Sequence, residues 1–113
     1  MSNKRLKTIK EKIEHINQIV EMFDNSITKA LSNKVYGSPA IIMHLVAMAE
    51  QFDKLKNDNA FEILMRYDKD DLKGAYDIRN FIAHDYAGVN IAIIETIIRE
   101  KLPHIYKITE ELL

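Results

Sequence analysis

The chain has 113 residues, of which 47% are hydrophobic and 29% are charged, and its formal net charge at pH 7 is −1. This length and composition favour one globular domain over residues 1–113, large enough to bury its own core. The absence of cysteine excludes a disulfide framework and a cysteine-based zinc site. No segment approaches about 18 uninterrupted apolar residues, and the lysine-rich start lacks the apolar run of a signal peptide, so we expect a cytoplasmic protein without a membrane partner. The near-zero net charge argues against a general nucleic-acid coat, so any RNA contact must use a local basic patch.

Apolar residues recur at helical spacing along most of the chain, and only three glycines and two prolines interrupt it. We therefore expect an all-α fold, an antiparallel bundle of about four to six helices. The first helix is predicted over residues 3–23, where apolar side chains alternate at spacings of three and four. Its start carries a cluster of five cations, Lys4, Arg5, Lys7, Lys10 and Lys12. This cluster is either a solvated helix face or a patch that steers phosphate groups.

The middle of the chain predicts a break at residues 24–26, a short continuation at 27–31 and a loop at 32–38. Ser38 as N-cap and Pro39 in the first turn predict a helix over residues 39–56. Within it, His44 is either a ligand or a satisfied, half-exposed helix histidine, and no second histidine or carboxylate stands at metal spacing beside it. Glu50 lies among apolar neighbours and is a candidate partner for Arg79.

The second half predicts a short helix at residues 60–66 and a loop at 67–70 that offers Asp68 or Asp70 as an N-cap. The next helix is expected from Asp71 toward Asp85, with a stop at Gly88. Asn90 is expected to cap a final helical stretch, in which Pro103 produces a kink or a junction between two abutting helices.

One stretch, residues 77–86, carries more chemistry than the helix pattern around it requires. It holds Asp77, Arg79, Asn80, His84 and Tyr86 in an otherwise largely apolar sequence. A charged side chain is rarely buried without a partner, because an unpaired buried charge is costly. We therefore interpret this stretch as a functional site.

Helix geometry limits how this site can be built. Arg79 and His84 are five residues apart, which is roughly 140° around the axis and about 7.5 Å along it, so they do not share a face of a straight helix. Asn80 is four residues before His84 and can contact it. A helix end or kink near residues 87–88, or two copies meeting across a twofold axis, would bring arginine and histidine together.

The pattern Arg79-Asn80-x-x-x-His84-x-Tyr86 resembles the signature of the HEPN superfamily. More narrowly, Ile-Ala-His-Asp-Tyr followed by Gly-Val-Asn resembles the HepT toxins, which are encoded beside a minimal nucleotidyltransferase antitoxin; we place the resemblance over residues 1–113. It implies a HEPN-like helical bundle and a toxin-like, metal-independent endoribonuclease of a type VII-like toxin–antitoxin system. It also implies that Arg79 and His84 form the cleavage site and that Tyr86 accepts AMP from the antitoxin. Two copies related by symmetry would bring two arginines and two histidines together, one histidine as acid and one as base, so we expect a homodimer whose interface contains the motif. The expected partners are RNA, the nucleotidyltransferase and a second copy of the chain, with no cofactor and no metal.

The residue types suit the implied chemistry. A histidine titrates near neutral pH and can move the proton of an RNA 2′-hydroxyl, and an arginine always carries charge and can bind two phosphate oxygens. Asn80 can orient His84 or bind a phosphate oxygen, and Asp77 is the other supporting residue. AMP on Tyr86 would place a phosphodiester beside Arg79 and block RNA.

Each site residue also has a purely structural interpretation. Arg79 can form an ion pair within the chain, for instance with Glu50 or Asp77, His84 can be a helix C-terminal cation, and the ring of Tyr86 can simply pack. Two other functions stay open: a non-catalytic HEPN subunit that binds a nucleotidyltransferase and presents its substrate, and a helical interaction module. Scattered histidines and the lack of glycine-rich phosphate motifs argue against metal hydrolysis and against dinucleotide binding.

Overall fold

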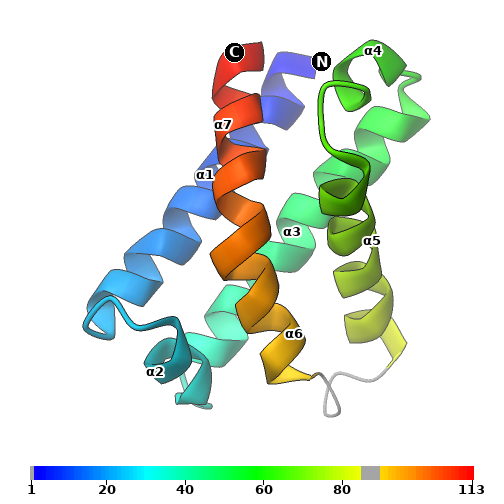
Figure 1. Cartoon of the computed structure of the whole chain (residues 1–113). Helices are drawn as coiled ribbons and strands as arrows, with labels where there is room; N and C mark the ends of the chain where they lie inside the picture. Colours follow the sequence, from blue (N-terminus) through cyan, green and yellow to red (C-terminus); the bar gives the residue numbers. More distant parts are fainter. Residues whose placement is uncertain (1, 85–89) are drawn as a thin grey trace.

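The computed structural model describes the backbone of residues 2–84 and 90–113 and the side chains of residues 2–80 and 90–113. Within these ranges every regular element is helical, which confirms the predicted all-α class (Figure 1). The last three elements follow one another without a break and are counted here as one helix. The described part of the chain therefore forms six helices, at the upper end of the expected number. None of the helices in this part combines the length and the hydrophobicity that crossing a bilayer requires.

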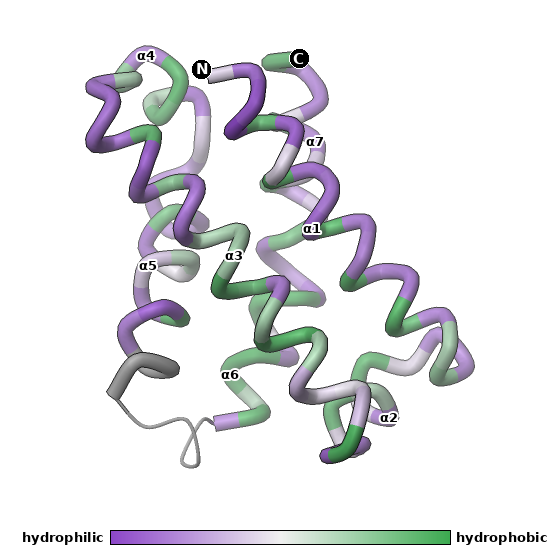
Figure 2. The backbone as a smooth tube through the Cα atoms, turned by 180° about the vertical axis from the view of Figure 1, so that it is seen from behind, coloured by the Kyte–Doolittle hydropathy of each residue, from purple (hydrophilic) through white to green (hydrophobic). Residues whose placement is uncertain are grey.

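Two long antiparallel helices, α1 (Ser2–Met22) and α3 (Gly37–Asn57), form the centre of the bundle. Their direction follows from an ion pair of 3.3 Å between Arg5, near the start of α1, and Asp58, just after α3. Hydrophobic and hydrophilic residues alternate along both helices when the bundle is seen from behind (Figure 2). This alternation places the apolar stripe of α1 in the core, with Leu6, Ile9, Ile13 and Ile16 almost fully buried.

The break after α1 occurs where the sequence predicted it. Asp24 and Asn25 have φ angles of 59° and 57°, a left-handed conformation that ends the helix. The short helix α2 (Ile27–Ser32) then begins with the side chain of Ser26 accepting a hydrogen bond from the backbone N–H of Lys29.

The predicted start of α3 is wrong by two residues, since the helix begins at Gly37 rather than Pro39. Ser38 is not the N-cap; its own N–H donates to the carbonyl oxygen of Asn33 at 2.8 Å. The side chain of Asn33 accepts from the N–H groups of Tyr36 and Gly37 at 2.8 and 3.3 Å and so satisfies two of the donors left free at the start of the helix. A Cβ atom on Gly37 would lie 2.1 Å from the carbonyl oxygen of Ala30, so only glycine permits this close approach of α2 and α3.

The helix that carries the candidate site is α5 (Lys69–His84), which follows the single turn α4 (Phe61–Leu64) and packs against α3. It begins two residues earlier than predicted, with Asp68 as the cap that accepts from the N–H of Asp70 at 2.8 Å. Among its described side chains, Ala75 and Ile78 are buried in the core. The predicted end at Asp85 and the stop at Gly88 lie outside the described residues.

The C-terminal rod contains α6 (Ile91–Thr96), a π-helical segment η1 (Ile97–Lys101) and α7 (Leu102–Leu112). Asn90 caps α6 as predicted, accepting from the N–H of Ala92 at 2.9 Å. The expected junction near Pro103 is present, because Pro103 stands in the first turn of α7. Proline has no N–H and its ring crowds the carbonyl four residues earlier, which gives a physical reason for the widened π turn just before it.

Candidate functional site

Arg79 lies on the side of α5 that faces α3, and its guanidinium is half exposed. Its Nη1 donates to a carboxylate oxygen of Asp53 at 3.1 Å. The two candidates from the sequence are not this partner: Glu50 is exposed one turn earlier on α3, and Asp77 pairs with Lys73 at 3.9 Å. The sequence left the partner of Arg79 open because the crossing of α3 and α5, which decides which turn of α3 meets Arg79, cannot be derived from spacing within one helix.

Among the described residues Asp53 is the partner of Arg79, and its carboxylate accepts a hydrogen bond from one of the five guanidinium N–H groups. The side chains of Arg79 and Asp53 are 44% and 34% exposed. Ion pairs this exposed contribute about 0–1 kcal/mol to stability, so a phosphate group can compete for the arginine at little cost. Asp53 holds the guanidinium in place without neutralising its capacity to bind an anion.

Tyr76, one turn before Arg79 on α5, completes this small cluster. Burial raises the pKa of the Tyr76 phenol, and the negative charge of Asp53 raises it further. Tyr76 and Asp53 were not among the residues singled out from the sequence. The available signal was weak: Asp53 stands one turn after Glu50, so the sequence showed two acids on the same side of α3 without showing which one meets α5.

The remaining predicted residues of the site are distributed along α5. Asn80 is exposed, and Asp77 is half exposed on another side of the helix from Arg79. The backbone is helical through His84, so residues 79 and 84 stay roughly 140° apart around the axis, as the spacing predicted. The side chain of His84 and the whole of Tyr86 lie outside the described residues, so the roles predicted for them stay predictions.

The basic cluster at the start of α1 is partly engaged within the chain. Arg5 pairs with Asp58 at 3.3 Å, and the Lys10 ammonium lies 3.6 Å from Glu110 and 5.9 Å from the centre of the Tyr106 ring. For these two cations the structure favours a role in packing over phosphate steering.

Two histidines meet between α1 and α3, with ring centroids 5.0 Å apart and the Nδ1 of His15 buried without a hydrogen-bond partner among the described residues. Burial lowers the pKa of His44, and the positive charge of Lys12 and then His15 lower it further. The part of the chain that the structure describes contains no group of three or more His, Cys, Asp or Glu side chains placed to hold a metal ion.

The family model of HepT-like ribonucleases matches residues 7–112 of the chain. A search of curated proteins and a search of solved structures find no match. The match extends over nearly the whole helical bundle, from the first helix to the last, and includes the Arg79 face of α5. The chain belongs to the family of HepT-like ribonucleases.

Proposed function

We propose that the chain is a toxin-like endoribonuclease that cleaves RNA without a metal, with Arg79 binding the phosphate and His84 transferring protons. The observation that carries the proposal is the family match, read together with the half-exposed guanidinium on α5. A ribonuclease of this kind needs a cation at the surface that an incoming phosphodiester can reach. Arg79 meets this requirement, since Asp53, its partner among the described residues, engages a single N–H group.

In the proposed reaction, the 2′-hydroxyl oxygen attacks the adjacent phosphorus atom and the bond from phosphorus to the 5′ oxygen breaks. A base takes the proton of the 2′-hydroxyl, and an acid gives a proton to the leaving 5′ oxygen. The products are a 2′,3′-cyclic phosphate and a 5′-hydroxyl. The guanidinium of Arg79 stabilises the negative charge that builds on the phosphoryl oxygens, and an imidazole is suited to both proton transfers near neutral pH.

The site is proposed to need two copies of the chain. Positions 79 and 84 are roughly 140° apart on α5, so one straight helix does not direct both side chains at the same phosphate. A homodimer that joins the two copies at this end of α5 supplies two arginines and two histidines, one histidine acting as base and the other as acid.

Control of the toxin is proposed to come from a cognate nucleotidyltransferase that transfers AMP from ATP to the hydroxyl of Tyr86 and releases pyrophosphate. Tyr86 follows Arg79 by seven residues, and an AMP phosphate attached there would occupy the arginine that RNA needs. In this proposal, Tyr86→Phe keeps the toxin active in the presence of the partner and ATP. Mass spectrometry should find an AMP adduct on the wild-type chain that is absent from Tyr86→Phe.

The ion pair between Arg79 and Asp53 also favours a second candidate, a non-catalytic subunit that binds a nucleotidyltransferase and presents its substrate. In that case Arg79 serves to join α5 to α3. The two candidates differ in whether the purified chain cleaves RNA on its own.

The test is RNA cleavage by the purified chain in EDTA. Arg79→Ala and His84→Ala should each abolish cleavage, whereas Arg66→Ala, which removes another half-exposed arginine paired with Glu111 at 3.6 Å, should not. Mixing the Arg79→Ala and His84→Ala chains should restore part of the activity if a site takes one residue from each copy. A wild-type chain that cleaves no RNA under any condition would favour the non-catalytic subunit.

A further inference from the structure

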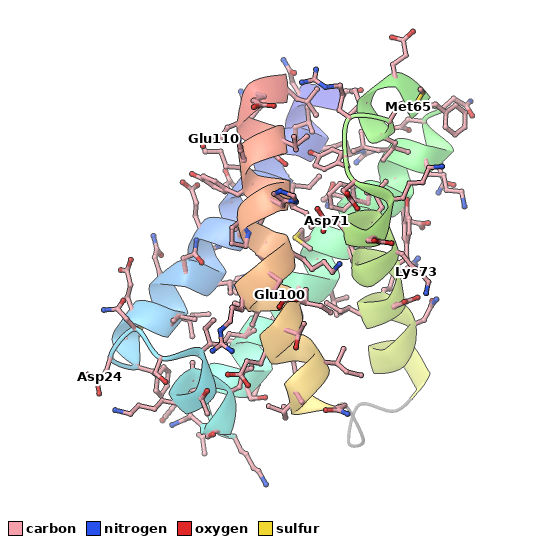
Figure 3. All side chains as sticks on the ribbon, in the orientation of Figure 1. Asp24, Met65, Asp71, Lys73, Glu100 and Glu110 are labelled. Carbon is pink, nitrogen blue, oxygen red and sulfur yellow. The ribbon has the colours of Figure 1, made fainter. Side chains whose placement is uncertain are left out.

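A surface groove of about 530 Å³ lies between α5 and the segment formed by α6 and η1, apart from the face of α5 that carries Arg79. Its lining combines apolar and charged side chains, among them Lys73, Gly74, Asp77, Ile93, Ile97 and Lys101. Figure 3 shows α5 beside the segment formed by α6 and η1, with Lys73 labelled on α5. Neither Arg79 nor Asp53 lines this groove.

Gly74 lies in the interior of α5, where glycine costs up to about 1 kcal/mol relative to alanine. Its φ angle is not positive, so the backbone conformation does not require glycine. A Cβ atom at this position would lie 3.7 Å from the Cδ of Lys101, an ordinary contact, so packing does not require glycine either. What the missing side chain provides is space in the groove.

The opposite wall comes from the C-terminal rod. Ile93 is 41% exposed although it is a large apolar residue, and Ile97 and Lys101 are the first and last residues of the π segment η1. Short π segments in helices are frequent at functional sites. An exposed apolar side chain next to such a segment, opposite a glycine, forms a surface on which the face of a flat aromatic ring can lie.

The two cations of the groove are held loosely. The Lys73 ammonium is 3.9 Å from Asp77, and the Lys101 ammonium is 3.8 Å from Asp71, both longer than a hydrogen bond. Lys73 is also largely exposed. Both ammonium groups can therefore turn toward an anion that enters the groove.

We propose that this groove binds one nucleotide of single-stranded RNA next to the cleaved bond, with its base on the exposed side chain of Ile93 and its phosphate at Lys73 and Lys101. The assignment rests on the proposed ribonuclease function, which supplies RNA as the substrate. Asp77 is seven residues before His84 on the same helix, so the groove begins about 10 Å along the axis from the proposed proton-transfer residue. A neighbouring nucleotide of the same strand can span that distance.

The mixture of charges favours a nucleotide over a bare anion. Two lysines and two aspartates, Asp70 and Asp77, line the groove, so its formal charge is close to zero. Carboxylates repel a free phosphate but accept hydrogen bonds from the amino groups of bases. Adenine offers such an amino group, whereas uracil offers only its ring N3–H, so we expect the groove to bind adenylate more tightly than uridylate.

The test uses trinucleotides of adenylate or uridylate that carry 2′-O-methyl groups, which prevents cleavage, and follows the backbone amide signals of the full chain by NMR. The adenylate trinucleotide should shift signals of residues 70–77 and 92–101 and bind more tightly than the uridylate one. Gly74→Leu fills the groove and should weaken binding at least about tenfold, a loss of about 1.4 kcal/mol. Gly74→Ala, with one added carbon, should weaken it less.

A matched pair of charge variants tests the phosphate contact. Lys73→Gln should reduce the slope of log affinity against log salt concentration by about 0.7, the value for one phosphate contact with a single strand. Lys29→Gln removes the same charge at a distant ion pair with Asp24 and should leave the slope unchanged. Circular dichroism melts of each variant establish that it is folded.

The groove assignment and the proposed function can fail separately. Any one of three results would overturn the groove assignment while cleavage itself persists. These are amide shifts confined to other parts of the chain, equal binding of the two trinucleotides, and RNA cleavage by Gly74→Leu with an unchanged KM. Binding of the adenylate trinucleotide in the groove by a chain that cleaves no RNA would support the groove and overturn the ribonuclease proposal.

Discussion

Asp53 is expected to restrain RNA binding as well as to hold Arg79, so Asp53→Asn should bind RNA more tightly. The carboxylate oxygen lies 3.1 Å from Nη1 of the arginine, and asparagine keeps an oxygen that can accept the same hydrogen bond. What the substitution removes is one negative charge beside the place where a phosphate would bind. The position of Arg79 should therefore change little while the repulsion of RNA disappears.

The size of this effect follows from the geometry. A phosphate bound on the free side of the guanidinium would lie about 6 Å from the Asp53 carboxylate, and for an exposed pair with an effective dielectric constant between about 40 and 80 the repulsion is about 1 kcal/mol. This corresponds to an affinity for RNA that is about fivefold higher. The cost to folding is the loss of a half-exposed ion pair, about 1 kcal/mol at most.

The assay measures the affinity of Asp53→Asn for an RNA that carries 2′-O-methyl groups, so that the measured affinity does not depend on cleavage. The affinity of Asp53→Ala for the same RNA is the comparison. The alanine variant loses the hydrogen bond that orients Arg79, so on cleavable RNA it should lower kcat, whereas the asparagine variant should mainly lower KM. Glu50→Gln, which removes a charge one turn away on α3, is the control and should alter both constants less. An affinity for Asp53→Asn equal to or below that of the wild type would refute this reasoning.

Three further predictions concern folding. Gly37→Ala should destabilise the chain by about 2 kcal/mol in urea unfolding, because its Cβ meets the carbonyl oxygen of Ala30. Gly74→Ala should instead stabilise the chain by up to about 1 kcal/mol, and equal stabilities of the two variants would contradict both predictions. The pKa of His44 is lowered chiefly by burial, so its contribution to stability is present above about pH 6.5 and is lost as the pH falls through the lowered pKa; His44→Gln should flatten the fall in melting temperature below that pH. Burial raises the pKa of Tyr67, so its contribution is present below about pH 10 and is lost as the pH rises through the raised pKa. Tyr67→Phe should remove that alkaline loss and, because the Tyr67 hydroxyl lies 2.7 Å from that of Thr109, cost about 1 kcal/mol at neutral pH; melts at pH 7 and above pH 10 measure both effects.

The long helices could be predicted because their signal is local. The apolar stripe of α1 has a period that only a helix buries on one side, and the prediction was correct to within a residue at each end. Asn90 was recognised as a cap for the same reason, since a cap depends on the side chain and the two or three residues after it. Such features require no knowledge of the rest of the fold.

The start of α3 and the π segment could not be predicted because their causes lie in tertiary structure. Ser38-Pro39 is a good local start signal, but Asn33 caps the helix from across the turn and Gly37 is required by the backbone of α2. Pro103 indicated a disturbance, but whether a proline kinks a helix or widens a turn depends on how the flanking residues pack. In each case a contact with another element selected among several locally acceptable structures.

The candidate site illustrates the same limit at the level of function. The sequence indicated that residues 77–86 carry unusual chemistry, and helix geometry showed that Arg79 and His84 occupy different sides of α5. The structure adds what each described side of this helix contacts: Arg79 meets Asp53 of α3, Ala75 and Ile78 enter the core, and Lys73 and Asp77 border the groove beside η1. A helix that is buried on one side and engaged on two others cannot rotate to bring Arg79 and His84 together without losing its core contacts. If these two residues act on one phosphate, the convergence has to come from a second chain or from the segment that follows His84, and the activity should depend on protein concentration in the first case only.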